Sequence, residues 1–213
     1  MTYGFLDIAS TPSVRAAQEA NGSRKLWQRF DGDRASDRFT ENEIAFIEAR
    51  DSFYLASVSE SGWPYAQHRG GPTGFLKVLD ETTLGFADFR GNRQYISLGN
   101  ISADDRVALL LMDYPNRARL KILAHMEVRE LDAASDLASR LALPRYRGKP
   151  ERAFLLHLET FDWNCPQHIT PRFTTAEIET AVSPLRTRIA ALEAENRALR
   201  AQIAGVVAEE SQS

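Results

Sequence analysis

The chain has 213 residues, of which 43% are hydrophobic, a composition typical of a folded protein and not of a disordered one. Its net charge of −3 gives no general attraction to nucleic acid or anionic membranes. No window reaches the roughly 18–20 apolar residues of a membrane span, and the N-terminus does not resemble a signal peptide. The single cysteine, Cys165, excludes an internal disulfide. We therefore expect a cytoplasmic protein without nucleic-acid or membrane partners.

Residues 1–39 are polar and are predicted to form an N-terminal extension with one short helix. Pro12 can open this helix, and Asn21-Gly22 can end it. Thr40 followed three residues later by Glu43 is a capping box, and apolar residues come directly after it. The pattern predicts a helix over residues 41–50 at the start of the main domain, residues 40–173.

From residue 51 the sequence is typical of β-strands joined by hairpins. SFYLASVS and WPYAQHRG form the first predicted hairpin, and GFLKVLD and TTLGFAD form the second. RVALLLMD and RLKILAHMEVR form a third, a helix follows over 133–143, and AFLLHLETFDW is the last strand. Such a series predicts a mainly β (α+β) fold, an antiparallel barrel or sandwich with short peripheral helices.

The C-terminal segment, residues 174–213, is predicted to be a helix, with Ser183 as its cap and Pro184 as its first residue. Positions spaced alternately by four and three form a heptad seam: Leu185, Ile189, Leu192, Asn196, Leu199 and Ile203. This helix either packs on its own domain or forms a coiled coil with a second copy, and the narrow seam favours a dimer zipper. The preceding TTAEIETAVS is not basic, which argues against a DNA-binding zipper.

The segment FRGNRQYISLGN is a candidate anion site. Arg90 and Arg93 flank a Gly-Asn turn, and we expect a helix to begin near Asn92. Two guanidiniums beside helix N-terminal amides would bind a dianion such as a phosphate monoester. The alternative is a solvated basic turn.

The segment QHRGGPTGFLK is a second candidate. Gln67 and Arg69 share one face of a predicted strand, and His68 lies on the other. The glycines that follow leave room for a ligand to approach the backbone. The alternative is an ordinary strand with a glycine bulge.

The segment WNCPQHITPR contains Cys165 and His168 at C-x-x-H spacing. No second pair completes four ligands, so zinc is not expected, and a cysteine nucleophile would need a geometry that the sequence does not show. The stiff loop suits the wall of a pocket for a heteroaromatic ring, with four candidate side chains: Trp163, Asn164, Gln167 and His168.

Taken together, these segments resemble the FMN-binding split-barrel superfamily of pyridoxamine 5′-phosphate oxidase over residues 40–172. The resemblance is carried by FYLASVSESGWPYAQHRGG, TTLGFADFRGNRQYISLGNISADDRVALLLMD and RLKILAHMEVRELD. It implies a six-stranded split barrel and a homodimer with FMN in two symmetric sites at the dimer interface.

The resemblance also implies roles for individual residues. The positions that match residues near the FMN phosphate, ribityl chain or ring are Arg69, Lys77, Arg90, Asn92, Arg93, Gln94 and Arg119, of which Arg119 would approach the ring from the partner subunit. Gln94 stands where the oxidases usually carry lysine. Gln167, His168 or Arg172 would donate a hydrogen bond to the flavin ring.

The resemblance implies an FMN-dependent oxidoreductase that takes a hydride from a reduced nicotinamide or a small substrate. WNCPQHITPR departs from the substrate motif of the vitamin B6 oxidases, so oxidation of B6 phosphates is not expected. The alternatives are a flavin carrier or sensor without turnover, and a relative that binds deazaflavin or haem.

Overall fold

The computed structural model describes residues 4–28, 36–132, 134–163 and 166–210. The chain divides into two compact units, Met1–Ile169 and Thr170–Ser213. Among the helices in the described ranges, none is both long and apolar enough to cross a membrane.

Four helices precede the sheet: α1 (Phe5–Ala9), α2 (Pro12–Ala20), α3 (Arg24–Gln28) and α4 (Glu41–Glu48). Two more lie between strands, α5 (Ile96–Ala103) and α6 (Asp136–Leu141), and α7 (Thr175–Glu210) lies in the second unit. The capping box of Thr40 and Glu43 is present at the start of α4, as the sequence predicts.

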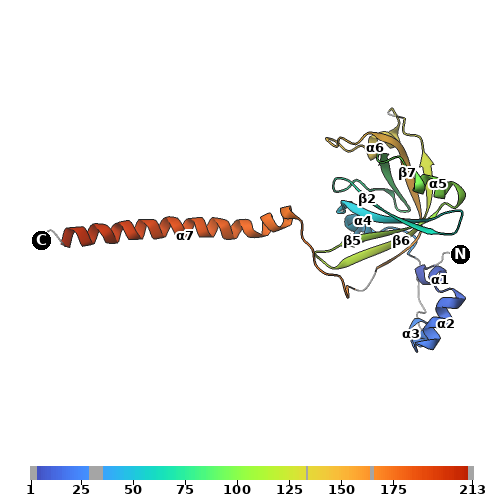
Figure 1. Cartoon of the computed structure of the whole chain (residues 1–213), viewed down its shortest axis with the longest axis horizontal. Coiled ribbons are helices and arrows are strands. Elements are labelled where there is room, and N and C mark those ends of the chain that lie inside the picture. The colour runs from blue at the N-terminus through green and yellow to red at the C-terminus, as the bar shows by residue number, and fades with distance from the viewer. Residues whose placement is uncertain (1–3, 29–35, 133, 164–165, 211–213) are drawn as a thin grey trace. The chain divides into compact units, whose positions relative to one another are not determined.

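The strands are β1 (Ser52–Val58), β2 (Pro64–Gly70), β3 (Lys77–Asp80), β4 (Thr83–Phe89), β5 (Arg106–Asp113), β6 (Ala118–Arg129) and β7 (Pro150–Trp163). They form one curled sheet in the order β2-β1-β5-β6-β7-β4-β3, in which every pairing is antiparallel (Figure 1). The edge strands β2 and β3 lie at opposite ends of this order and are not paired. The sheet is therefore an open, split barrel.

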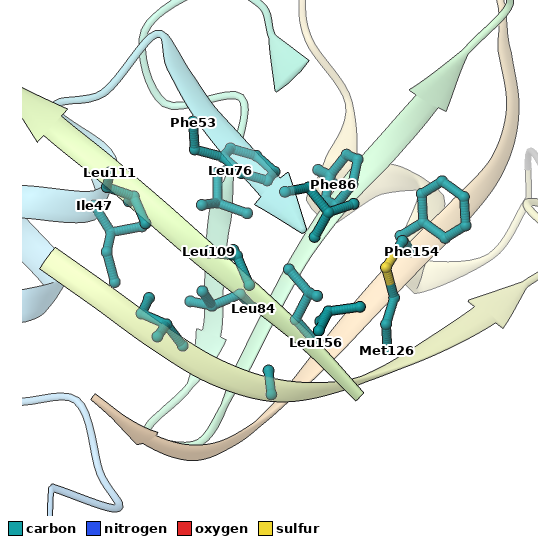
Figure 2. Packing of buried hydrophobic residues seen from close by; sticks show 14 of the residues in the cluster. Ile47, Phe53, Leu76, Leu84, Phe86, Leu109, Leu111, Met126, Phe154 and Leu156 are labelled. Atoms are coloured by element: carbon teal, nitrogen blue, oxygen red, sulfur yellow. The ribbon is translucent and has the colours of Figure 1, made fainter. Parts of the chain in front are cut away.

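The core lies inside the curl of the sheet. Alternate residues of β5 and β6 are buried, as the two-residue period of a strand requires. Figure 2 shows side chains from α4, from the segment before β3 and from strands across the sheet meeting in this core: Ile47, Phe53, Leu76, Leu84, Phe86, Leu109, Leu111, Met126, Phe154 and Leu156. One continuous apolar cluster therefore joins the strands from β1 to β4 across the sheet order and packs the segment before β3 against them.

The expected count of six strands is wrong by one. That count came from the family resemblance, whereas the segments predicted one by one include β3 within GFLKVLD; its Lys77 and Val78 pair with Gly85 and Leu84 of β4 at the edge of the sheet. Helices α1 and α3 were also not anticipated, because each is only five residues long and shows no sustained helical periodicity.

Two predicted helix starts are wrong. Helix α5 begins at Ile96 and not near Asn92, because the Asn92 side chain accepts from the Gln94 amide (3.1 Å) and forms a turn instead. Helix α7 begins at Thr175 and runs through Pro184. Thr174 and Glu177 form a capping box at its N-terminus, well upstream of that proline.

Candidate anion-binding site

A cavity of about 210 Å³ lies where the barrel is split. Its walls come from β2, from β4 and the loop after it, from the first turn of α5 and from β7. In the sheet order, β2 is one edge and β4 is next to the opposite edge. The cavity therefore lies between two ends of the sheet that no backbone hydrogen bonds join.

An ion pair spans this gap. Arg69 Nη1 of β2 donates to Asp88 Oδ1 of β4 at 2.9 Å, and both side chains are largely buried (17% and 10% exposed). The guanidinium also lies over the rings of Phe86 and Phe154. Burial raises the pKa of Asp88, and the positive charges of Arg69 and Arg152 only partly oppose this effect. The cost of burying the ionised Asp88 carboxylate is therefore only partly compensated by the neighbouring arginines.

Arg69 has a donor that the described residues do not satisfy. Its Nε is buried and has no hydrogen-bond partner among them. A buried guanidinium N–H without an acceptor carries a desolvation cost of about 1–3 kcal/mol. Since Arg69 lines the cavity, an acceptor bound there would remove this cost.

The loop after β4 presents backbone amides to the cavity. Arg93 and Tyr95 have left-handed backbones, with φ of 63° and 53°. Tyr95 is the N-cap of α5, and its side chain makes no capping hydrogen bond. Ile96, Ser97 and Leu98, the first turn of α5, line the cavity. Their N–H groups carry the partial positive charge of a helix N-terminus, which favours an anion.

Two side-chain hydrogen bonds hold α5 in place against the sheet. Ser97 Oγ donates to Gln67 Oε1 of β2 at 2.9 Å. One turn later, Asn100 Nδ2 donates to Ser57 Oγ of β1 at 3.0 Å. Ser97, Asn100 and Ser57 are all buried, so these bonds fix the direction in which the N-terminus of α5 points.

The charges around the cavity sum to a positive value. Glu151 of β7 lines the cavity and lies 3.0 Å from Arg152 and 3.7 Å from Arg90. Together with Arg69, Arg93 and Asp88, the cluster holds four guanidiniums and two carboxylates. The remaining two positive charges match a dianion.

Five of the residues singled out from the sequence meet in this cavity: Gln67, Arg69, Asn92, Arg93 and Gln94. Arg90 lies beside Glu151, at the border of the cavity. The two segments FRGNRQYISLGN and QHRGGPTGFLK, read separately in the sequence, thus build one site.

Lys77 and Arg119 do not line this cavity. Lys77 lies on the edge strand β3 opposite Gly85, at the far side of β4. Arg119 lies on β6 opposite Met112, and its buried Nε has no partner among the described residues.

The described residues of WNCPQHITPR do not line it either. The Trp163 indole N–H donates to Glu43 Oε1 of α4 at 2.7 Å, and its ring packs edge-on against Phe46. Gln167 and His168 are exposed in a turn, with His168 at a φ of 64°. Asn164 and Cys165 lie outside the described residues. Groups of three or more histidine, cysteine or acidic side chains suited to a metal are absent from the described ranges.

Sequence reasoning missed four residues of the site: Asp88, Tyr95, Ser97 and Glu151. Each of them acts through a partner on another element, such as Asp88 with Arg69 and Tyr95 with Glu151, which accepts from the Tyr95 hydroxyl at 3.1 Å. A local pattern cannot reveal such pairs. The one available signal was a carboxylate, Asp88, at the end of an otherwise apolar strand.

The family model for pyridoxamine 5′-phosphate oxidase matches residues 39–161, which is more than half of the chain. The chain belongs to this family. The matched range runs from just before α4 into β7, so it contains β1 to β6, most of β7 and every described residue that lines the cavity. No curated protein matches the chain.

Solved structures with a similar arrangement include HupZ from Group A Streptococcus, with a TM-score of 0.48 and 16% identity over 63% of this chain and 100% of that one. An FMN-binding protein from Syntrophomonas wolfei has a TM-score of 0.42 and 11% identity over 69% and 97%. A FAD-binding protein from Mesorhizobium loti has 0.43 and 14% over 59% and 94%. Because these TM-scores are below 0.5, the assignment to the family rests on the sequence match.

Proposed function

We propose that this chain is an FMN-binding flavoprotein and that it works as an FMN-dependent oxidoreductase in a homodimer. The observation that carries the proposal is the buried, unpartnered Nε of Arg69 in a cavity that also receives Arg93 and the uncapped N-terminus of α5. Family membership supports a flavin as the ligand, and the net charge of the cluster supports its phosphate.

The cavity suits one end of FMN and not the whole molecule. Its volume of about 210 Å³ is below the ~300–1,000 Å³ that pockets for complete drug-sized ligands occupy. The phosphate and the start of the ribityl chain fit its polar wall. The isoalloxazine ring then needs a second apolar surface, which a partner subunit would supply.

The outer face of the sheet supports a partner. Along β1 and β5, the side chains that point away from the core are mainly apolar, and Tyr54 and Val58 are 44% and 40% exposed. A groove of about 580 Å³ crosses this face beside Ala56, Val58 and Leu123. An exposed apolar face on an antiparallel sheet is typical of a surface that another chain covers.

When bound, FMN supplies hydride and electron transfer. The chain itself holds and orients the cofactor: Arg93 and the amides of α5 bind the phosphate, and Arg69 Nε donates to an acceptor beside it. Among the described lining residues the carboxyls are Asp88 and Glu151, both paired with arginines, and we assign neither of them an acid–base role. A reduced nicotinamide or a small substrate would deliver a hydride without an acid–base group.

The buried, unpartnered Nε of Arg69 in the cavity also favours a second candidate, a flavin-binding carrier or sensor without turnover. The carboxyls of the cavity, Asp88 and Glu151, are both engaged by arginines and serve its architecture. Both candidates bind flavin, but only an oxidoreductase turns over. We place either of them in the cytoplasm, as expected from the sequence.

The visible spectrum of the purified protein tests the proposal. FMN gives two flavin bands, whereas a deazaflavin gives one and haem gives a Soret band. We expect flavin bands, or their appearance after FMN is added, and FMN on extraction and mass measurement. A protein that stays colourless with added FMN would refute the proposal.

Steady-state oxidation of reduced nicotinamides by the flavin-loaded protein separates the two candidates. We expect turnover with oxygen or an artificial electron acceptor present. Full flavin loading without turnover for any reduced nicotinamide or small reductant would leave the carrier or sensor.

A further inference from the structure

Helix α7 carries an exposed apolar stripe along most of its length. The helix has 36 residues and is therefore about 54 Å long. The stripe is made of side chains that are 45–63% exposed: Ile178, Leu185, Ile189, Leu192, Leu199 and Ile203. With Val182 and Asn196 they occupy the a and d positions of successive heptads, and Ile178 and Val182 extend the seam upstream of Pro184.

A stripe of this kind needs a partner. Most helices in proteins are stabilised by packing an apolar face and not by intrinsic propensity. A seam restricted to a and d fits one other helix with the same repeat, since a helix that packs on a globular domain needs a wider stripe. We propose that α7 forms a parallel, in-register, two-stranded coiled coil with α7 of a second copy of this chain.

The core residues point to two strands. Val182, Ile189 and Ile203 at a are β-branched, and d is held mainly by leucine, the combination that favours parallel dimers. Asn196 is the one polar a residue. In a parallel, in-register pair the two Asn196 side chains meet and hydrogen-bond to each other.

The flanking charges agree with this register. Positions g and e hold Arg188, Glu193, Glu195 and Arg200. In a parallel dimer, g lies beside e of the next heptad of the other strand. Arg188 then meets Glu193 of the second copy, and Glu195 meets Arg200 of the second copy. Symmetry doubles both attractive pairs, and no like charges face each other across these positions.

Antiparallel pairing is disfavoured by the same residues. In any antiparallel register a faces d, so Asn196 would lie against a leucine with its amide unpaired. In the register with the longest overlap, Glu193 would also face Glu193 of the second copy, and Arg186 would face its Arg200. Staggered registers remove these repulsions but shorten the seam.

Disulfide trapping of the full chain tests the proposal. In a Cys165→Ser background, Ile189→Cys and Ile203→Cys are made separately, with Ala201→Cys on the opposite helix face as a matched control. We expect both seam variants to form disulfide-linked dimers in a glutathione redox buffer and the control to form at least about tenfold less. The two positions are roughly 21 Å apart along the helix, so no antiparallel pair can link both.

Each other outcome overturns the proposal. A link at only one of the two positions means an antiparallel or staggered pair. Links at neither position, or equal linkage in the Ala201→Cys control, mean that the seam does not pair. Circular dichroism of each variant verifies that α7 is intact, so that absence of a link is not due to unfolding.

Charge reversal provides a second test that core packing cannot mimic. Arg188→Glu/Arg200→Glu makes the four residues of these two pairs all acidic, and Glu193→Arg/Glu195→Arg makes them all basic. These two chains are co-expressed with different tags in the Ile189→Cys background. Random pairing would give two mixed dimers for one dimer of each unmixed kind. We expect the ratio of mixed to unmixed dimers to be several-fold higher. A statistical ratio would contradict pairing through these charges.

Discussion

Two buried arginine–aspartate pairs in the barrel have similar geometry, but they differ in whether the arginine has a hydrogen-bond donor without an acceptor. Arg50 and Asp113 are 3.0 Å apart, and Arg69 and Asp88 are 2.9 Å apart. Their exposures are similar, at 16% and 9% for the first pair and 17% and 10% for the second. Arg50 also donates through Nε to the Phe46 carbonyl and through Nη1 to the Met112 carbonyl.

The carboxylates differ in the same way. Asp113 accepts from both the backbone and the side chain of Asn116, and these bonds with Arg50 outweigh the effect of burial and lower its pKa. Among the described residues, Asp88 accepts a hydrogen bond from Arg69 and has Arg152 Nε 3.7 Å away, but burial prevails and raises its pKa. A pair that serves only the fold satisfies its own donors and acceptors, whereas the pair in the cavity leaves a donor free for a ligand.

Removal of Arg50 is expected to have the largest effect, and on stability alone. Arg50→Ala leaves the buried Asp113 without its partner, which typically costs about 3–5 kcal/mol. We expect the free energy of unfolding in urea to fall by this amount, while the folded fraction keeps its affinity for FMN. A loss of FMN affinity by the folded protein would mean that the two pairs are not functionally distinct.

Removal of Arg93 is expected to affect binding and not folding. Arg93→Ala removes a charge-assisted hydrogen bond to the phosphate, worth about 1.5–3 kcal/mol, or roughly a ten- to hundredfold loss in FMN affinity by titration. Arg117→Ala is the matched control, because Arg117 is also an exposed arginine with a positive φ (53°) but lies outside the cavity. Equal losses in both variants would remove Arg93 from the site.

Replacement of Arg69 by lysine tests the free donor itself. Arg69→Lys keeps the positive charge beside Asp88 but removes Nε, so we expect a loss of about 1–2 kcal/mol in FMN affinity and a smaller change in stability. Arg50→Lys is the control, in which stability should fall and affinity should not. Unchanged FMN affinity in Arg69→Lys would show that Nε does not meet the ligand.

The smallest expected effects are opposite pH dependences. The folded pKa of Asp113 is below its ordinary 3.8, so its stabilisation is complete above about pH 3.8 and is lost as pH falls through the folded value. The folded pKa of Asp88 is above 3.8, so its contribution is largest when protonated and is lost as pH rises through the folded value.

Urea midpoints of the ligand-free protein between about pH 2.5 and 6 measure these slopes. Asp113→Asn should reduce the loss of stability toward acid, and Asp88→Asn should reduce the loss as pH rises. Changes of the same sign in both variants would mean that the carboxyls are in equivalent environments.

Much of the barrel could be predicted from the sequence because its signals are local. The run RVALLLMD coincides with β5, and the capping box at Thr40 marks the start of α4. The site was predictable only in part. Arg69 and Arg93 stood out as cations beside glycines, but their joining depends on a strand order that brings β2 and β4 together across the split.

The errors have physical causes as well. The bond from the Trp163 indole N–H to Glu43, 120 residues away in sequence, could not be anticipated, and the place of Trp163 on the wall of a ring pocket stays a prediction. The start of α5 was placed too early because the side chain of Asn92 competes with the helix for the Gln94 amide. Long-range partners and local competition of this kind leave no mark in a periodic pattern.

The strand from which the chain passes into its second unit is not an edge strand. β7 has 14 residues and is paired with β4 over residues 150–157 and with β6 over residues 153–163. Interstrand hydrogen bonds lie perpendicular to the strands. A force along β7 would therefore act on the hydrogen bonds to β4 and to β6 together, and would not break them one after another from one end. The bond from Trp163 to Glu43 anchors the last residue of the strand. We therefore expect the barrel to resist a pull along β7 more strongly than a pull on its edge strands β2 or β3.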